Sequence, residues 1–539
     1  MKLLPASCSK LKPTLHNEWF WVTFGSQILE GCWSYDYFHT QTSPLNPRTI
    51  SIPGLLAWII CCITLVPPIL GRGGFFDGLL YASISRNLSM QEWYSTQLTF
   101  SDTFYNEFSE HPPFMFWIGS WWFRLMGDHP WTEKSFAFVI AVGLLLGFYH
   151  FWKKQIPGRA FSYGWGWWML LWCLVSGPLW GLGQYILENP LTLFTFLAVW
   201  SAMSLNHLLA GFGLGLFTWL AFITKGPPAL FPLAAPLLLW ICRLRTTRET
   251  VRIAVWSSFV LGILSVFSWL WLPLRSAMLQ YWRAQVQAVF NGDRPPNEYG
   301  SEHMRIDMAF TFIHQLLMPI LLLLLCYLFY KFRTSRDSEK ISEPFDSLDL
   351  KKRTLFFTFV AFSASAPLFI SPKLLPHYLI PSYPWWTLAM TTAALPFLRQ
   401  LPFHTYYERK LKHQLILNIS AFVFVLICLV YALTKRNVPV RDFSLQHDIK
   451  QVVELLKRKE QKGECSGIAI SSELHGQYST WAYFQRYYQI SLFTNPMPEH
   501  CLILKGKESQ GIEGFRLISD STSNFDIYTA HSIQVKSVK

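Results

Sequence analysis

Charge is scarce in this sequence. Of its 539 residues only 15% are Asp, Glu, Lys or Arg, whereas 51% are hydrophobic and 17% are aromatic. A composition so poor in charge excludes an ordinary soluble protein. Several apolar stretches reach the roughly 20 residues that a membrane-crossing helix needs, among them SIPGLLAWIICCITLVPPIL at 51–70 and AVWSSFVLGILSVFSWLWLPL at 254–274. We therefore predict an integral membrane protein.

Recognisable processing and metal signals are also missing. Residues 1–50 lack the basic start, apolar run and small-residue cleavage site of a signal peptide, which predicts that the first span is a retained anchor. No His, Cys, Asp or Glu cluster has metal-site spacing, so no cofactor is predicted. A divalent cation at Glu110 and His111 is the less favoured alternative to a hydrogen-bonding role of these two residues.

Of the ten cysteines, only Cys465 and Cys501 fall in the polar C-terminal region, where a disulfide between them is an open alternative.

The positive charge follows a pattern of its own. A formal net charge of +13 raises the alternative of nucleic-acid binding, but much of the excess lies in short loops between apolar runs. Basic loops of this kind mark the cytoplasmic side of a membrane protein, so no nucleic-acid partner is predicted. The segments predicted to be cytoplasmic are the N-terminal residues 1–50 and the basic loops at 153–159, 243–252, 331–353 and 399–413.

Placing those loops on one side predicts about eleven spans within a membrane domain at 51–433. The fold class is thus a polytopic α-helical membrane protein. After the first span at 51–70, the others are expected at about 135–152, 162–182, 190–208, 209–223, 227–242, 254–274, 311–330, 354–371, 378–398 and 414–433.

The stretch EHPPFMFWIGSWWF at 110–123 is not counted among these spans. A full crossing here would move every later basic loop to the opposite side. Its uninterrupted apolar part, 112–123, is short for a span and rich in tryptophan, as interfacial segments are. We therefore predict a surface helix in the first external loop, with a re-entrant hairpin as the alternative.

The last hundred residues differ in composition. From about 434 onward the sequence is polar, with an amphipathic run at 447–459, strand-like pieces at 467–470 and 501–504, and a helical segment near 474–488. This pattern predicts a small α/β domain at 434–539 outside the membrane.

The external loops hold most of the unusual polar residues. Asp77 opens an amphipathic stretch that places an acid at the head of a helix on the membrane surface, with apolar positions at Leu79, Leu80, Ile84 and Leu88. The alternative interpretation of Asp77 is a helix N-cap. Further acids, bases and polar residues in the other external turns are Glu188, Asn189, Lys225, Arg294, His303, Lys373, His377 and Tyr378.

These loops are predicted to share one face of the membrane. A carboxylate there can deprotonate an acceptor hydroxyl, while Lys and Arg can stabilise a departing phosphate. The predicted spans are nearly free of Asp, Glu, Lys and Arg, which argues against a transporter with charged residues at the bilayer midplane. A transporter of lipid-linked sugars and a polysaccharide polymerase or ligase remain the alternatives to a transferase.

Five motifs in this order resemble the GT-C glycosyltransferases that use polyprenyl-phosphate sugars, in particular the bacterial aminoarabinose transferases of lipid A and the protein O-mannosyltransferases. The motifs are FFDGLLY at 75–81, EHPPFMFW at 110–117, ILENPLTLF at 186–194, TKGPPAL at 224–230 and KLLPHYLIPSYP at 373–384.

The resemblance implies an inverting transfer of a sugar from an undecaprenyl-phosphate donor to a lipid, glycan or protein acceptor at the periplasmic face of the bacterial inner membrane. It assigns Asp77 as the base and Glu110 as the second catalytic residue, with Glu110 and His111 lining the donor or acceptor site. It assigns Lys225, Lys373 and Tyr378 to the lipid phosphate. The remaining predicted substrate-binding residues are Glu188, Asn189, Arg294, His303 and His377. His111 stands where a lysine is usual, so we expect substrate preference to differ there.

Overall fold

In the computed structural model, the residues from Arg48 onward form one unit, separate from residues 1–47. The described part of the chain comprises residues 51–93, 95–156, 159–291, 301–334, 347–371, 375–401, 411–434, 438–461, 467–494, 502–506, 515–519 and 522–530.

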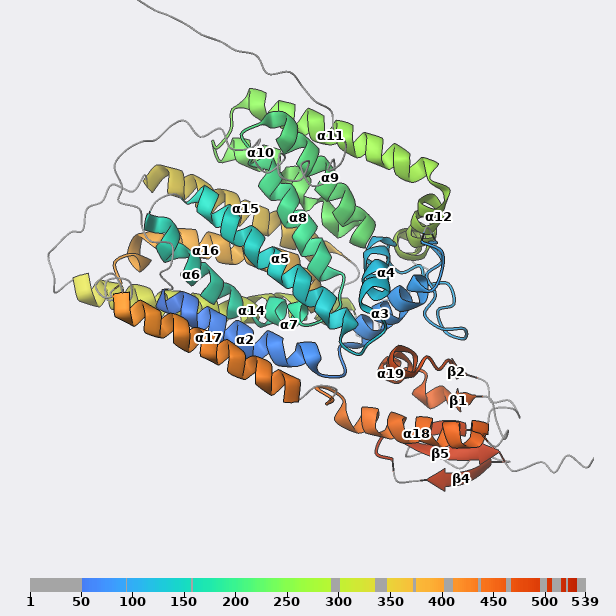
Figure 1. The fold of residues 1–539 in the computed structure, drawn as a ribbon. Helices are drawn as coiled ribbons and strands as arrows, with labels where there is room; N and C mark the ends of the chain where they lie inside the picture. The colour runs from blue at the N-terminus through green and yellow to red at the C-terminus, as the bar shows by residue number, and fades with distance from the viewer. Residues whose placement is uncertain are drawn as a thin grey trace, which may run out of the picture. The chain divides into compact units, whose positions relative to one another are not determined.

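Between Ile52 and Thr434 the described residues are mostly helical (Figure 1). The α-helices are α2 (Ile52–Leu70), α3 (Phe76–Ser89), α4 (Phe114–Met126), α5 (Thr132–Gln155), α6 (Arg159–Cys173), α7 (Ser176–Leu182), α8 (Glu188–Ala202), α9 (His207–Lys225), α10 (Ala235–Ile241), α11 (Thr247–Leu270), α12 (Leu272–Tyr281), α13 (Ala288–Asn291), α14 (Ser301–Thr334), α15 (Ser347–Ile370), α16 (Tyr383–Leu398) and α17 (Leu411–Thr434). Two 3₁₀ segments, η1 (Pro227–Ala234) and η3 (Pro376–Ser382), precede α10 and α16, and a π-helical turn, η2 (Trp282–Gln287), follows α12.

Five of the described helices are long and apolar enough to cross a membrane: α5, α9, α11, α14 and α15. The predicted count of about eleven spans is therefore not confirmed. The expected span at 162–182 is divided between α6 and α7, and those at 227–242 and 378–398 each begin as a 3₁₀ segment. Prolines explain the two 3₁₀ starts, because each proline lacks the N–H that continues an α-helical ladder.

The helices α3 and α4 lie between α2 and α5 in the chain, where the first external loop was predicted. α4 has 13 residues and spans about 20 Å, shorter than a bilayer core. Trp121 and Leu125 on α4 are exposed, as an interfacial helix requires. α3 is different, because 10 of its 14 residues are buried. The apolar side that we predicted to rest on the membrane is covered by protein instead.

The chain after α17 combines helices with a small sheet, which confirms the mixture of helices and strands predicted there; we call this part the C-terminal domain. Its helices are α18 (Phe443–Gln461) and α19 (Tyr478–Tyr488), with a one-turn 3₁₀ segment, η4 (Ser472–Leu474), between them. Its strands are β1 (Ile468–Ile470), β2 (Leu492–Phe493), β3 (Leu502–Gly506), β4 (Phe515–Ser519) and β5 (Phe525–Ala530). The sheet order is β2-β1-β3-β5-β4, in which β1 pairs parallel with β2 and β3, and β5 pairs antiparallel with β3 and β4. Cys465 and Cys501, the predicted disulfide candidates, lie outside the described residues.

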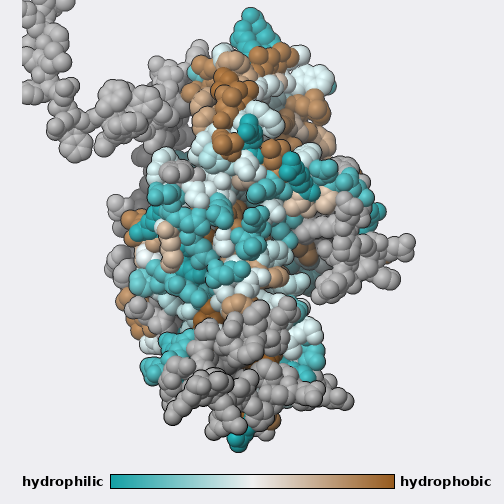
Figure 2. Space-filling model, turned by 90° about the vertical axis from the view of Figure 1, so that its right-hand side faces the viewer, coloured by the Kyte–Doolittle hydropathy of each residue, from teal (hydrophilic) through white to brown (hydrophobic). Residues whose placement is uncertain are grey.

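A buried ionic network joins this domain to the membrane domain. Arg486 of α19 pairs with Asp128 and Glu133, each at 2.6 Å, and donates to the carbonyl of His129. Burial opposes the charge of Arg486, but Glu133 and Asp128 raise the pKa of its guanidinium above the usual value. Arg86 of α3 belongs to the same network, since it lies 3.9 Å from Asp128 and donates to the carbonyl of Gln485 at 2.9 Å. α19 therefore covers α3, and Figure 2 shows hydrophilic residues (teal) predominating over the middle of the face that carries these elements.

Removal of the Arg486 charge tests whether this ionic network holds α19 against α3. Arg486→Met leaves the buried carboxylate of Glu133 without its partner, so we expect a loss of about 3–5 kcal/mol in unfolding free energy. Hydrogen exchange should accelerate in α3 and α19. The matched control is Glu454→Gln in the exposed pair Lys450–Glu454, which should change stability by less than about 1 kcal/mol. Equal losses of unfolding free energy in the two variants would contradict this role of the ionic network.

Candidate active site

The site is built on the antiparallel pair α8 and α9. Asn206 caps α9 by accepting hydrogen bonds from the backbone of Leu208 and Leu209, which starts the return helix four residues after α8 ends. The first residue of α8, Glu188, therefore meets the last residue of α9, Lys225. Gly226 ends α9 with a φ of +77°, and a Cβ at this position would collide with the phenol of Tyr281.

Glu188 and Lys225 form a buried ion pair. Their side chains are only 2% and 6% exposed, respectively. His377 of η3 brings its Nε2 to 3.6 Å from the same carboxylate. The ammonium of Lys225 also lies 3.9 Å from the ring centre of Tyr378, in cation–π geometry. Three segments distant in sequence thus converge on one pair of charges.

α3 enters the site through its first turn. Its N-cap is Phe75, whose backbone N–H donates to Oε1 of Gln184 at 2.9 Å. Asp77 is the second residue of the helix rather than the cap, so the N-cap interpretation was wrong. The reason is that the helix begins one residue earlier than the acid. The ring of Phe75 lies 5.8 Å from that of His377, which brings the start of α3 beside the ion pair.

The phenol of Tyr81 interacts electrostatically with the acids of the site. It lies one turn after Asp77, on the same face of α3, and its hydroxyl is hydrogen-bonded to Nε2 of His111 at 2.9 Å. Burial first, and then the neighbouring groups Asp77, Glu188, Tyr378 and Glu110, raise the pKa of Tyr81 well above its usual value. The phenol therefore stays protonated.

Glu110 and Asn189 hold different positions at the site. Oε1 of Glu110 accepts a hydrogen bond from the hydroxyl of Tyr105 at 3.2 Å. The amide of Asn189 donates to the carbonyls of Gly181 and Gln184, each at 2.8 Å, and so fixes the turn before α8. Its Oδ1 is buried and accepts no hydrogen bond from the residues that the structure describes.

Three predicted site residues cannot be placed in this geometry. Arg294 and Lys373 lie outside the described residues, and for His303 only the helical backbone of α14 is described. The described residues contain no group of three or more His, Cys, Asp or Glu that could hold a metal ion.

Sequence reasoning missed several contacts at the site. Tyr81 had a usable signal, because its spacing of four from Asp77 places it on the same helix face. Two residues of the C-terminal domain had none: Tyr478 stacks on Phe76 at 6.0 Å, and the guanidinium of Arg441 lies 5.8 Å from the ring of Phe75. Their separation in sequence hides these contacts from any local pattern.

No known protein-family model matches the sequence, and no curated protein does so either. Solved structures do match, and the chain has the GT-C glycosyltransferase fold. It is similar to ArnT from Cupriavidus metallidurans in the apo state, with 13% identity, 88% of this chain and 96% of that chain covered, and a TM-score of 0.54. The same protein bound to undecaprenyl phosphate matches with 12% identity, 89% and 97% coverage and a TM-score of 0.50.

A double-mutant cycle tests the ion pair. Glu188→Gln leaves Lys225 buried without its counter-charge, so we expect a loss of about 3–5 kcal/mol in unfolding free energy. Lys225→Met alone should cost a similar amount. The double variant should lose clearly less than the sum of the two, because it buries no unpaired charge. Additive losses, measured by thermal unfolding in detergent, would contradict the pairing.

Proposed function

We propose that the chain is an inverting glycosyltransferase that moves a sugar from an undecaprenyl-phosphate-linked donor to an acceptor hydroxyl. The observation that supports this most directly is the convergence of Asp77, Glu110 and His111 with the Glu188–Lys225 pair at one end of the helices. The fold supports the same class of reaction, since ArnT has it and was solved with undecaprenyl phosphate bound.

In this reaction the carboxylate of Asp77 takes the proton of the acceptor hydroxyl. The hydroxyl oxygen attacks the anomeric carbon from the side opposite the phosphate, and the bond from that carbon to the phosphate oxygen breaks. Lys225, Lys373 and Tyr378 hold the phosphate as its charge develops. Glu110 and His111 bind the reacting sugars, with Tyr81 fixing the imidazole of His111 through their hydrogen bond.

The remaining predicted residues would line the same space. His377 approaches the carboxylate of Glu188 and borders Phe75, so it stands between the ion pair and the start of α3. Arg294 precedes the long helix α14 in the sequence and His303 lies in its first turn, and both would contact the donor or the acceptor. The basic loops, predicted to be cytoplasmic, support our assignment of this end of the helices to the periplasmic face of the inner membrane. The acceptor is a lipid such as lipid A, a glycan or a protein.

Asp77→Asn tests the assignment of the base. The variant removes the proton acceptor with little change of shape, so sugar transfer should fall at least about 100-fold while membrane insertion stays intact. Transfer is measured as the sugar restored to envelope lipids and proteins when the variant is expressed in a deletion strain. The control is Glu92→Gln, an exposed acid in the same loop, which should restore transfer fully. Full transfer by Asp77→Asn would refute the role of Asp77.

Mass spectrometry of the envelope separates the transferase from its alternatives. In a deletion strain we expect one sugar to be missing from a lipid, glycan or protein acceptor while its undecaprenyl-linked donor accumulates. Loss of long glycan chains with intact short acceptors would favour a polymerase or ligase. A donor that accumulates on the cytoplasmic side of the membrane would favour a transporter.

A further inference from the structure

Three aromatic rings from distant parts of the chain lie beside the start of α3. Phe76, the residue before Asp77, stacks on Tyr478 of α19 with 6.0 Å between the ring centres and 24° between the ring planes. Tyr478 also stacks on Phe104, which precedes α4, at 6.3 Å and 25°. The rings of Phe76, Tyr478 and Phe104 are thus nearly parallel, and we call them the aromatic row.

The aromatic row connects the segments that carry the two proposed catalytic acids. At one end, Phe76 directly precedes Asp77 in the chain. At the other end, the ring of Phe104 lies 4.3 Å from that of Tyr105, whose hydroxyl donates a hydrogen bond to Glu110 at 3.2 Å. A molecule that rests on the aromatic row therefore lies next to both of these segments.

Tyr478 is open to solvent on a fixed support. The residue is 46% exposed. Trp481, one turn later on the same face of α19, is only 3% exposed, and its ring lies 4.7 Å from that of Phe104. The ionic network of Arg486 holds the same helix against the turn before α5. The exposed ring is thus held in position before a ligand arrives, which lowers the entropy cost of binding.

Phe75 and Phe76 border two different groups of residues. The ring of Phe75 lies 5.8 Å from that of His377, which approaches the ion pair beside the proposed phosphate ligands. Phe76 instead borders the C-terminal domain through Tyr478. In an inverting transfer the acceptor approaches the anomeric carbon from the side opposite the phosphate. The aromatic row therefore suits the acceptor better than the departing phosphate.

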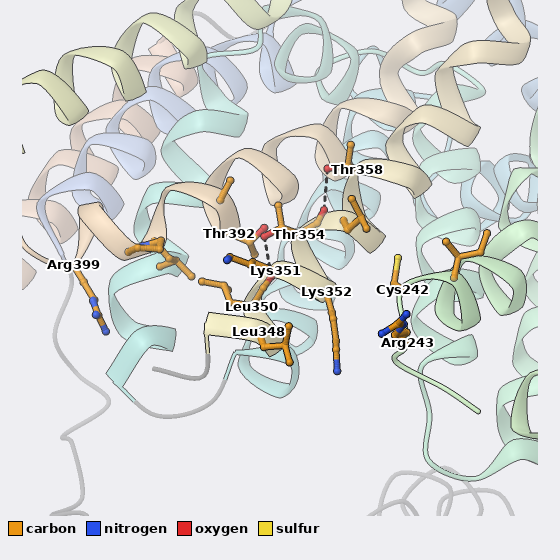
Figure 3. Close-up of a pocket in the computed structure, with 15 residues that line it drawn as sticks. Cys242, Arg243, Leu348, Leu350, Lys351, Lys352, Thr354, Thr358, Thr392 and Arg399 are labelled. Atoms are coloured by element: carbon orange, nitrogen blue, oxygen red, sulfur yellow. Dashed lines mark hydrogen bonds between the residues drawn. The ribbon is translucent and has the colours of Figure 1, made fainter. Parts of the chain in front are cut away.

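A separate cavity of about 770 Å³ lies between α10, α15 and α16 (Figure 3). Its lining consists of aliphatic side chains, threonines, a cysteine and cations, with no aromatic ring among the lining residues that the structure describes. These residues belong neither to the candidate active site nor to the aromatic row. Because the cavity lacks a flat π face, the aromatic row is the better surface for a sugar ring.

We propose that Tyr478 binds a sugar ring of the acceptor, next to the hydroxyl that Asp77 deprotonates. This inference rests on the proposed function and narrows its acceptor to a glycan or a glycolipid. One face of a pyranose carries mostly C–H groups, which pack against the electron-rich face of an aromatic ring. Its hydroxyls need hydrogen-bonding partners, and the exposed residues Asn106 and Gln477 lie close in sequence to the rings of the row.

The test uses the full chain in detergent, with the extracted envelope of the deletion strain as the source of substrates. The undecaprenyl-linked lipids are separated from the remaining glycolipids and glycans, so that the donor and acceptor fractions can be diluted independently. Transferred sugar is measured by mass spectrometry, which gives kcat and an apparent KM for each fraction.

Tyr478→Ala should raise the apparent KM for the acceptor fraction about tenfold, while kcat and the apparent KM for the donor fraction change by less than about twofold. Tyr478→Phe and Tyr478→Trp keep a π face and should stay within about threefold of wild type. Tyr478→Leu keeps apolar bulk but loses the π face, so it should behave like Tyr478→Ala. An unchanged elution profile and melting temperature show that each variant is folded.

Two control variants change residues outside the aromatic row. Phe443→Ala removes an exposed ring from α18 of the same domain. Ala393→Trp places an indole at an exposed position of the cavity lining. Both should keep the wild-type apparent KM for the acceptor fraction.

Several results would overturn the proposal. An unchanged acceptor KM in Tyr478→Ala would do so, as would wild-type behaviour of Tyr478→Leu, which indicates simple apolar packing. A raised KM for the donor fraction alone would assign the ring to the donor instead of the acceptor. An equal loss in Phe443→Ala would indicate general damage to the C-terminal domain. If wild type transfers no sugar from the extract, the proposed function itself is refuted, and this inference with it.

Discussion

The ion pair between Glu188 and Lys225 is the interaction on which the site depends. Two charges with almost no solvent contact are stable only if each stays within reach of the other, because desolvation of either one alone costs several kcal/mol. This requirement fixes the start of α8 against the end of α9. It also holds η3, since His377 and Tyr378 both contact the pair. Phe75 then packs on His377, so the position of α3 follows from the same pair of charges.

A second ionic network, around Arg486, determines what covers α3. Arg486 holds α19 against the turn before α5, and Arg86 of α3 shares Asp128 with it and also bonds to the backbone of α19. The helix that carries Asp77 and Tyr81 is therefore enclosed between α4 and a domain that begins more than 350 residues later. Side chains on an enclosed helix are held more rigidly than side chains on a helix at the lipid surface. This rigidity suits the proposed role of Asp77 as a base, because a base must be oriented toward its substrate. Tyr478 and Arg441 bring the same domain to the border of the site.

The mostly helical fold and the small C-terminal sheet were predictable, because helices and strands each leave a local pattern of apolar spacing. The environment of α3 was not. The spacing of Leu79, Leu80 and Ile84 is that of any amphipathic helix. This spacing does not show whether the apolar face is covered by lipid or by α19. Whether Asp77 is the N-cap turned on whether the helix began at Phe76 or two residues later, a difference that capping preferences alone do not resolve. The span count is not confirmed, and two of the expected spans begin as 3₁₀ segments that contain prolines.

The charges at the site also affect which of the proposed residues can bind the donor phosphate. Asp77, Glu110 and Glu188 place three carboxylates around Tyr81, while Lys225 is already committed to Glu188. An incoming donor phosphate would be repelled by this arrangement unless further cations faced it. Among the described residues Arg441 is near, beside Phe75. The sequence supplies two more, Lys373 only four residues before His377 and Arg294 before α14. In the proposed reaction Lys373 therefore adds the positive charge that the phosphate needs beside Lys225, and Lys225 also holds Glu188, His377 and Tyr378 in place.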